Sequence, residues 1–449
     1  MVTILPALRQ VREDLAGILD RDFVERLCRE LGYRWRDRQL DPYTTLHLFI
    51  LQVLNRNTAM THLPHLAGER FTASAYCQAR QRLPLELFER LVDGFGRALQ
   101  RSDEIPRWHG HRVALMDGSG FSMPDTAELQ AHFGQPGSQK PGCGFPVAHL
   151  LALLDAEAGF LREVVAAPLR THDMTHAADL HPSLCSGDIV VADRGFCSYA
   201  HLALISQANL HAVFRIHQAQ IVSFRPHRPS AGETLGTGQP RSRWVQRLGE
   251  RDQLVEWCKP PARPKWMSPG QFASLPDRLL VRELRWRIPG PGCRVREVTL
   301  VTTLVNPQRY PAAEIARLYR LRWQVEVDLR DLKITLGMDV LKGCKVKTVM
   351  KELLVFVLVY NLVRLVALKA ARRQRVRPHR ISFIDALRWL QPPKPGTPLP
   401  DLIVNPERPG RIEPRAIKRR PKNYARLTRP RREVRKYWRK YLKERRNVA

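Results

Sequence analysis

The sequence of 449 residues lacks the marks of several protein classes. Its eight cysteines are scattered without a C-x-x-C pair, which argues against a zinc ribbon or a disulfide framework and fits a reducing compartment. The most apolar run, LLVFVLVYNLV at 353–363, is too short to span a bilayer and is typical of a buried helix. The start, MVTILPALRQVREDL, has no signal-peptide pattern. We therefore expect a cytoplasmic protein with no membrane partner.

Acidic residues are scarce relative to basic ones. The chain has 43 Asp and Glu against 74 Lys and Arg, a net charge of +31. Such an excess is typical of proteins that bind polyanions, and nucleic acid is the expected partner. From residue 406 onward, 18 basic and 4 acidic residues give +14. This tail, with Tyr424, Tyr437, Trp438 and Tyr441 interleaved, predicts contact with DNA phosphates without sequence specificity.

Residues 1–104 have helical apolar spacing and predict a helical N-terminal DNA-binding region. The segment TASAYCQARQRLP at 72–84 offers Thr72 or Ser74 as an N-cap and Pro84 as a stop. With Gln78, Arg80 and Arg82 on its surface, this helix could read DNA as in a helix-turn-helix. A plain helical packing domain remains the alternative.

Residues 105–345 change to an α/β pattern. Runs of strand length occur at 113–117, 149–155, 160–169, 189–193 and 210–216, with a hairpin-like turn at 155–160. We expect a helix between the third and fourth runs, starting near Thr171 or Asp173. Three antiparallel strands, a helix, a buried strand, a helix and a further strand make an α/β sheet.

A β-rich insertion is expected within this region, at about 217–292. DQLVEWC at 252–258 and LLVRELRWRI at 279–288 look like strands, and PGPG at 289–292 looks like a turn. After residue 345 come an apolar helix near 352–371, a Pro-rich linker at 392–410 and the basic tail. Residues 346–449 are therefore expected to form C-terminal helices, a linker and a tail.

Two of the predicted strands end alike. VALMD-GSG and IVVAD-RGF each run from apolar residues into an aspartate with a glycine close behind, which predicts Asp117 and Asp193 at the carboxyl ends of buried strands. A turn aspartate is the plain interpretation of either one alone. On neighbouring strands, however, the two carboxylates could not both stay ionised without a cation, and oxygen ligands of this kind select Mg²⁺ or Mn²⁺.

A third carboxylate lies in LYRLRWQVEVDLRDLK, residues 318–333. On a helix, leucines and Val325 form a buried stripe, and Tyr319, Arg322, Glu326 and Lys333 share an arc of roughly 60° beside it. Ordinary i,i+4 ion pairs on a solvated face are one interpretation. Alternatively, Glu326 completes a two-metal site with the two aspartates, and Arg322 and Lys333 bind phosphates of the cut strand.

These residues carry a family resemblance. Tyr319-x2-Arg322-x3-Glu326-x6-Lys333, with Asp117 in MDGSG and Asp193 in ADRGF, resembles the D-D-E transposases of bacterial insertion sequences, in particular the group with the Y-R-E-K signature (insertion sequence family four). The resemblance covers about 110–345, and more loosely the helical N-terminus and the basic tail.

The resemblance implies an RNase H-like catalytic domain with a β-rich insertion between the second aspartate and the glutamate. It implies Mg²⁺-dependent cleavage and joining of DNA, with Mn²⁺ as a substitute, and a homodimer when bound to DNA. Asp117, Asp193 and Glu326 would be the metal ligands and catalytic groups, and Tyr319, Arg322 and Lys333 would contact the transposon end. A bacterial, nucleoid-associated location follows. In some relatives a tryptophan of the insertion stacks on a flipped base, and Trp244, Trp257, Trp266 and Trp286 are the candidates here.

We therefore expect a DNA transposase that cuts the ends of an insertion sequence and joins their 3′-hydroxyls to target DNA at one two-metal site. A metal-dependent nuclease or resolvase of the same fold would cut without joining. A catalytically inactive DNA-binding regulator is the alternative from a different class, although three intact carboxylates count against it.

Overall fold

The computed structural model describes residues 4–100, 105–171, 173–217, 220, 222–227, 241–287, 297–391, 398–407 and 427–446. The N-terminal part is helical, as predicted. Its helices are α1 (Leu5–Val11), α2 (Glu13–Gly17), α3 (Arg21–Glu30), α4 (Pro42–Leu54), α5 (Leu63–Ala67), α6 (Ala73–Arg82) and α7 (Leu85–Gln100). The side chain of Thr72 accepts a hydrogen bond from the backbone of Ala75 and caps α6, because the first amides of a helix have no partner within it.

Among the described residues, the strands form one mixed sheet in the order β3-β2-β1-β4-β5-β9-β8-β7-β6. The strands are β1 (Val113–Ser122), β2 (Val147–Asp155), β3 (Leu161–Pro168), β4 (Ile189–Ala192), β5 (His211–Arg215), β6 (Ser242–Gly249), β7 (Asp252–Cys258), β8 (Arg278–Arg287) and β9 (Glu297–Thr302). The first three are antiparallel to one another, and β4 and β5 continue from β1 in parallel. The five predicted strand runs and the turn after Asp155 are confirmed.

The first part of the sheet is buried on both faces. Along β1, Leu115 belongs to the hydrophobic core on the side of the N-terminal helices, whereas Met116 belongs to the core on the opposite side. Val191 and Ala192 of β4 divide in the same way. Because successive side chains of a strand point to opposite faces, strands buried on both faces read as continuous apolar runs, as these do.

The connection between β3 and β4 differs from the prediction. Short 3-10 turns, η1 (Asp173–Thr175) and η2 (Ala178–Ser183), take the place of the expected helix. Pro182 lies inside η2, and a proline cannot donate the backbone hydrogen bond that a continuing α-helix needs. Two further helices flank the sheet: α8 (Ala127–Phe133) after β1, and α9 (Tyr199–Gln207) between β4 and β5 as expected.

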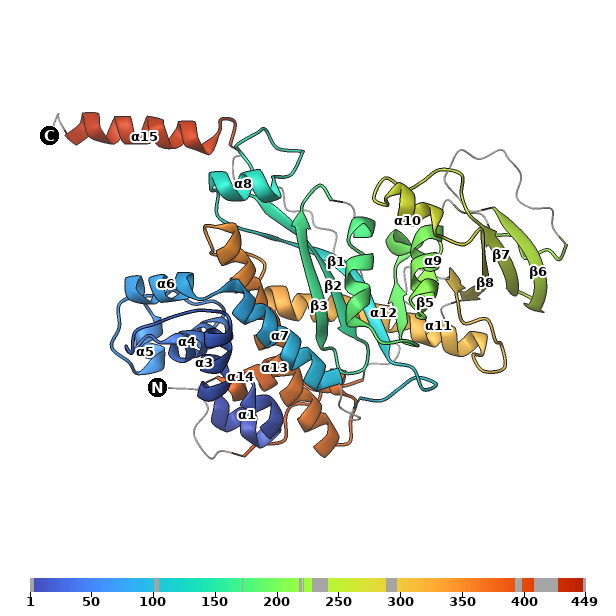
Figure 1. Cartoon of the computed structure of the whole chain (residues 1–449), viewed down its shortest axis with the longest axis horizontal. Helices are drawn as coiled ribbons and strands as arrows, with labels where there is room; N and C mark the ends of the chain where they lie inside the picture. Colours follow the sequence, from blue (N-terminus) through green and yellow to red (C-terminus); the bar gives the residue numbers. More distant parts are fainter. Residues whose placement is uncertain are drawn as a thin grey trace.

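The strands predicted at 252–258 and 279–288 are β7 and β8, and the turn predicted at 289–292 lies outside the described residues. The sequence did not reveal β6, which pairs with β7 at the edge of the sheet. A short helix, α10 (Pro269–Ala273), lies between β7 and β8. Through β9, which pairs with both β5 and β8, these strands extend the central sheet to one side (Figure 1).

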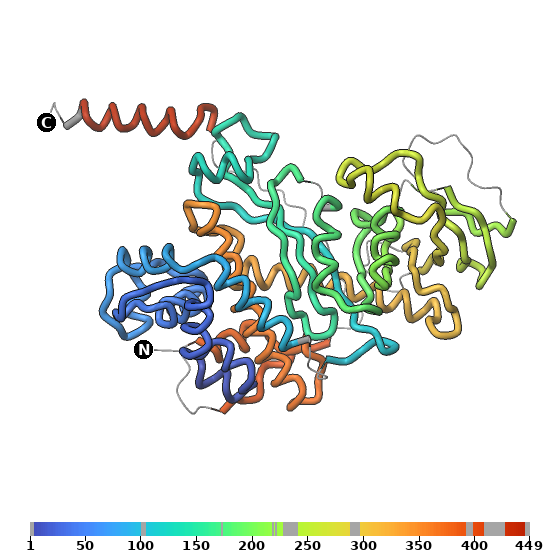
Figure 2. The backbone as a smooth tube through the Cα atoms, in the orientation of Figure 1, coloured from blue at the N-terminus to red at the C-terminus, as the bar shows by residue number. Residues whose placement is uncertain are grey.

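Past β9 come α11 (Ala312–Arg320), α12 (Arg322–Arg330), a π-helical turn η4 (Asp331–Thr335), α13 (Val346–Arg373), a 3-10 turn η5 (Pro378–Arg380) and α14 (Phe383–Leu390). The long α13 packs against α4 and α7 of the N-terminal part and against β3. Figure 2 shows the blue N-terminal and orange C-terminal segments side by side.

By length and composition α13 could cross a membrane, but 89% of its most apolar window is buried inside the protein. It is thus the buried helix expected around 353–363, and it is longer than the run of apolar letters.

The basic tail contains a helix that the sequence analysis did not predict, α15 (Arg431–Arg446). It projects from the body next to α8 (Figure 1). Its first residue, Arg431, donates its backbone N–H to the carbonyl of Gly142, and its guanidinium lies over the ring of Phe145. Tyr437, Trp438 and Leu442 are exposed on it.

Candidate active site

Asp117 and Asp193 lie side by side on parallel strands. The pairing of β1 with β4 ends at Met116 opposite Ala192, so the two aspartates are the next residues on neighbouring strands. Asp193 follows β4, as expected. Asp117 does not end its strand, because β1 continues its antiparallel pairing with β2 as far as Ser122. The expectation of two strand ends was wrong for Asp117, but the expected adjacency does not depend on it.

Each aspartate accepts a hydrogen bond from a nearby backbone amide. Oδ1 of Asp117 accepts from Gly118 N at 2.8 Å, and Oδ1 of Asp193 accepts from Gly195 N at 2.7 Å and caps the 3-10 turn η3 (Arg194–Phe196). These short-range bonds orient the carboxylates.

Arg322 lies between two of the predicted carboxylates. Its Nη1 is 3.6 Å from Oδ2 of Asp117, and its Nη2 is 3.0 Å from Oε1 of Glu326. The Arg322 side chain is 12% exposed, whereas that of Glu326 is 59% exposed. One guanidinium thus links a carboxylate of the sheet to one on α12, because residues four apart lie on the same helix face.

The pKa of the Asp117 carboxyl is raised to about 6. Burial is the main cause, since it disfavours the charged form, and the negative charges of Asp193 and Glu326 add to it. The Gly118 amide and Arg322 act in the opposite direction. The negative charge on Asp117 is therefore only partly compensated by the protein.

The signature residues are not on one continuous helix, as the sequence suggested. The segment divides into α11 and α12 at Leu321, and η4 follows directly after α12. The apolar stripe is nevertheless buried as predicted, including Leu318, Val325 and Leu332. The π-helical turn carries Lys333, whose Nζ donates to Ser119 Oγ at 3.0 Å, two residues after Asp117. Such turns often occur at functional sites.

Tyr319, at the end of α11, is only 2% exposed. Burial raises the pKa of its hydroxyl, and Arg322 partly opposes this. Tyr319 is therefore a buried neighbour of Arg322.

Comparison with known proteins identifies the family of the chain. The family model described as the transposase DDE domain matches residues 108–362, which include the aspartates and the signature helices. The chain belongs to the DDE transposase family. The transposase InsG for insertion sequence element IS4 of Escherichia coli (strain K12) is 26% identical over 453 aligned residues, 94% of this chain and 96% of that protein. A solved piggyBac transposase synaptic complex with hairpin DNA aligns over 87% of this chain and 80% of that chain, with a TM-score of 0.45 and 9% identity.

The protein is thus a DNA transposase, an enzyme that cleaves DNA and transfers its strands. DNA is its partner, and its family uses divalent metal ions. Within the described part of the chain, no three His, Cys, Asp or Glu side chains are grouped as a ready metal site. The donor set at the junction of β1, β4 and α12 nevertheless fits such an ion, since it consists of carboxylate oxygens and includes the partly buried, incompletely neutralised Asp117.

Sequence reasoning missed two polar groups near the candidate site. Ser119 binds Lys333, and its only signal was its place in MDGSG. Arg215 ends β5 directly after Phe214, which pairs with Ala192 of β4, and its charge opposes the rise in the pKa of Tyr319. The sequence feature that could have indicated Arg215 is a basic residue at the end of an apolar strand.

Two subsidiary predictions need correction. Arg80 cannot read DNA on the surface of α6, because it is 4% exposed, donates to Gln52 at 2.8 Å and lies over the ring of Phe49. Among the insertion tryptophans, Trp257 is fully buried and donates to Glu283 at 2.9 Å. It is therefore not available to stack on a base, whereas Trp244, Trp266 and Trp286 are partly buried.

Proposed function

We propose that this transposase cuts the ends of its insertion sequence and joins them to target DNA with Mg²⁺, or Mn²⁺ as a substitute, held by Asp117, Asp193 and Glu326. Two observations support the proposal: Asp117 and Asp193 follow paired residues on adjacent strands, and Arg322 contacts both Asp117 and Glu326. When bound, a pair of such ions activates the attacking oxygen and stabilises the leaving oxygen of a phosphodiester.

The side chains around the carboxylates have separate tasks in this proposal. Arg322 balances the charge of Asp117 and Glu326 before DNA binds, and Arg322 and Lys333 hold phosphates of the cleaved strand. Tyr319 holds Arg322 in place; at 2% exposure in this structure it does not itself reach DNA, so its expected contact with the transposon end passes through Arg322. Ser119 orients the ammonium group of Lys333.

The strand order supports the assignment of residues 105–345 to an RNase H-like catalytic domain with an insertion near 217–292. Three antiparallel strands, two parallel strands that continue from the first, and a helix carrying the third carboxylate support this fold. Residues 1–104 would be a DNA-binding region and 346–449 a C-terminal region that ends in a basic tail. In this proposal the protein forms a homodimer when it brings two DNA ends together. It acts on the DNA of the bacterial nucleoid.

The test uses the full-length protein and a duplex that carries the native element end. We expect nicking and 3′-end joining with Mg²⁺ or Mn²⁺, and no product with EDTA. Asp117→Asn and Asp193→Asn should abolish both products while duplex binding persists, because only a ligand charge is lost. Cutting without joining would identify a nuclease, and nicking that survives EDTA would contradict a metal mechanism.

A further inference from the structure

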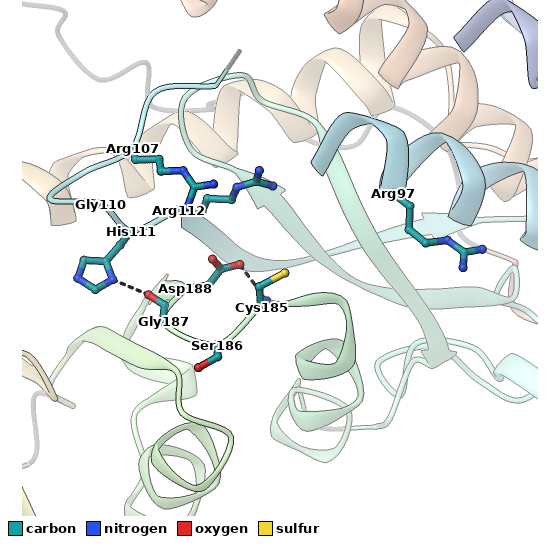
Figure 3. Close-up of a pocket in the computed structure, with 9 residues that line it drawn as sticks. All are labelled: Arg97, Arg107, Gly110, His111, Arg112, Cys185, Ser186, Gly187 and Asp188. Atoms are coloured by element: carbon teal, nitrogen blue, oxygen red, sulfur yellow. Dashed lines mark hydrogen bonds between the residues drawn. The ribbon is translucent and has the colours of Figure 1, made fainter. Parts of the chain in front are cut away.

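A cavity of about 350 Å³ lies at the end of the sheet where the central strands β1 and β4 begin. Its walls come from α7, from the segment that enters β1, and from the loop that enters β4 (Figure 3). Its lining includes Arg97, Arg107, His111, Arg112, Cys185 and Asp188. We call it the arginine pocket. None of these residues belongs to the carboxylate site.

The two loops that form the pocket are fixed to each other. Nδ1 of His111 donates to the Gly187 carbonyl at 2.6 Å, so its Nε2 accepts from the hydroxyl of Tyr310 at 2.7 Å. Gly110 and Gly187 both have φ of +85°, a left-handed conformation that glycine adopts without strain. These tight turns and hydrogen bonds fix the two loops relative to each other before a ligand binds, which favours binding because less order must be gained.

The pocket has an excess of positive charge. Its one carboxylate, Asp188, already accepts from Arg162 Nη1 at 2.8 Å and from the Cys185 backbone at 3.2 Å. Arg112 is 9% exposed, and no hydrogen bond or ion pair joins its side chain to another residue in the described part of the chain. None of its side-chain nitrogens is among the fully buried atoms that lack a partner within the described ranges, so the guanidinium is open to the pocket and can donate to a ligand there.

Figure 3 shows the guanidinium of Arg107 beside that of Arg112. Arg97 lies on α7, at a greater distance from both. Counting the neighbouring Asp155 and Arg162 with the pocket still leaves four guanidinium groups against two carboxylates. Paired guanidinium groups match the geometry of a phosphate, to which each can donate two parallel hydrogen bonds.

We propose that the arginine pocket binds a backbone phosphate of the DNA on which the transposase acts, at a point remote from the cut. Asp188 precedes and Asp193 follows the short strand β4, so the pocket and the carboxylates lie about 16 Å apart at roughly 3.3 Å per residue. The phosphate held by Arg107 and Arg112 is therefore not the one attacked. The pocket gives the duplex a second point of attachment across the sheet.

The first test is the salt dependence of duplex binding by the full-length protein. Arg107→Gln and the double variant Arg97→Gln/Arg107→Gln remove exposed charges and leave the buried Arg112 in place. Each lost phosphate contact should reduce the slope of log K against log salt by about 0.9. Arg388→Gln removes the same charge from an exposed position on α14 and serves as the control. Slopes equal to that of the control in both pocket variants would overturn the proposal.

The second test uses the exposed thiol of Cys185 as a reporter inside the pocket. Alkylation of Cys185, followed by mass spectrometry of its peptide, should slow several-fold when duplex DNA is bound, and the double variant should lose this protection. Inorganic phosphate at millimolar concentration forms a parallel arm. Protection by phosphate but not by DNA would assign the pocket to a free anion and contradict the proposal, as would no protection by either.

Discussion

Two carboxylates two residues apart on α12 have opposite surroundings. Glu326 is mostly exposed, and its partner is Arg322 at the rim of the sheet. Asp328 is fully buried and forms an ion pair with Arg364 of α13. Arg364 in turn donates to the hydroxyl of Tyr360 at 3.0 Å. The same helix therefore offers one carboxylate to solvent and ligands and uses the other to attach the sheet layer to the C-terminal helix.

The difference shows how this protein separates stability from chemistry. At the junction with α13 most polar groups are paired, although Oδ2 of Asp328 has no hydrogen-bond partner among the described residues. The Asn361 side chain donates to and accepts from the Leu161 backbone, and Glu352 accepts from the backbone of Lys342 and Gly343. At the active-site end of β1, the pKa of Asp117 is raised to about 6, chiefly because burial disfavours its charged form and nearby groups only partly offset this. Perturbed groups of this kind concentrate at functional sites.

The largest effect is expected from Glu326→Gln. This change keeps the shape and hydrogen-bonding capacity of the side chain but removes a ligand charge, so nicking of end-containing DNA should fall by at least about 10³-fold. DNA binding should persist or improve, because repulsion of phosphates is reduced. The measurement is Mg²⁺-dependent nicking under single-turnover conditions, with Glu250→Gln, an exposed glutamate near β7, as control. Nicking at the wild-type rate would reduce Glu326 to a helix ion-pair partner.

Asp328→Ala should instead destabilise the fold. It leaves Arg364 buried without its carboxylate, at a cost of about 3–5 kcal/mol. The measurement is the denaturant midpoint of unfolding. The double variant Asp328→Leu/Arg364→Met removes both charges and should recover much of the loss. If the double variant is less stable than Asp328→Ala, the unpaired charge of Arg364 is not the cause of the destabilisation.

Arg322→Ala and Lys333→Ala should give a smaller effect that depends on DNA concentration. Both residues are proposed to hold phosphates, so raising the DNA concentration should restore part of the nicking rate, whereas no concentration should rescue Glu326→Gln. Nicking rates over a DNA titration measure this. Lys369→Ala, exposed near the end of α13, is the control. A loss at saturating DNA as complete as that of Glu326→Gln would place these residues in the chemical step.

The sequence predicted those features that depend on local pattern. Apolar runs identified β1, β4 and β5, and helical spacing identified the stripe that contains Val325 and Leu332. The adjacency of Asp117 and Asp193 required an added assumption, that β1 and β4 are neighbours, which the parallel pairing confirms.

Other features depend on partners distant in the chain and left no local signal. The helix divides at Leu321, where the backbone stays in the right-handed helical region and no glycine or proline marks the break. β6 is largely exposed and polar, and forms because β7 offers it an edge. The pairing of Asp328 with Arg364 joins residues on two helices, and their spacing along the sequence does not indicate it. The charge balance around Asp117 likewise follows from packing.

The smallest effect concerns two buried histidines that remain neutral, unlike the buried ion pair of Asp328 with Arg364 and the partly balanced charge of Asp117. The rings of His181 and His201 stack with their Nε2 atoms 3.0 Å apart, and Nδ1 of His201 donates to the carbonyl of Phe196, at the end of the turn that Asp193 caps. Nε2 of His201 must then accept a hydrogen bond from Nε2–H of His181, and protonating His201 would set two N–H groups against each other.

Burial accordingly lowers the pKa of His181 to about 4 and that of His201 to about 3. The unfolded chain takes up protons near pH 6.5 and the folded chain does not, so the stability from this pair is complete above pH 6.5 and is lost as the pH falls from 6.5 through 4. Denaturant midpoints measured from pH 7 to pH 4.5 should decline. In His181→Gln, whose amide can still donate to His201, the decline should be shallower because one titrating group is gone. An equal decline in the variant would assign the pH dependence to other groups, and the buried imidazoles would then be no part of the acid sensitivity of the transposase.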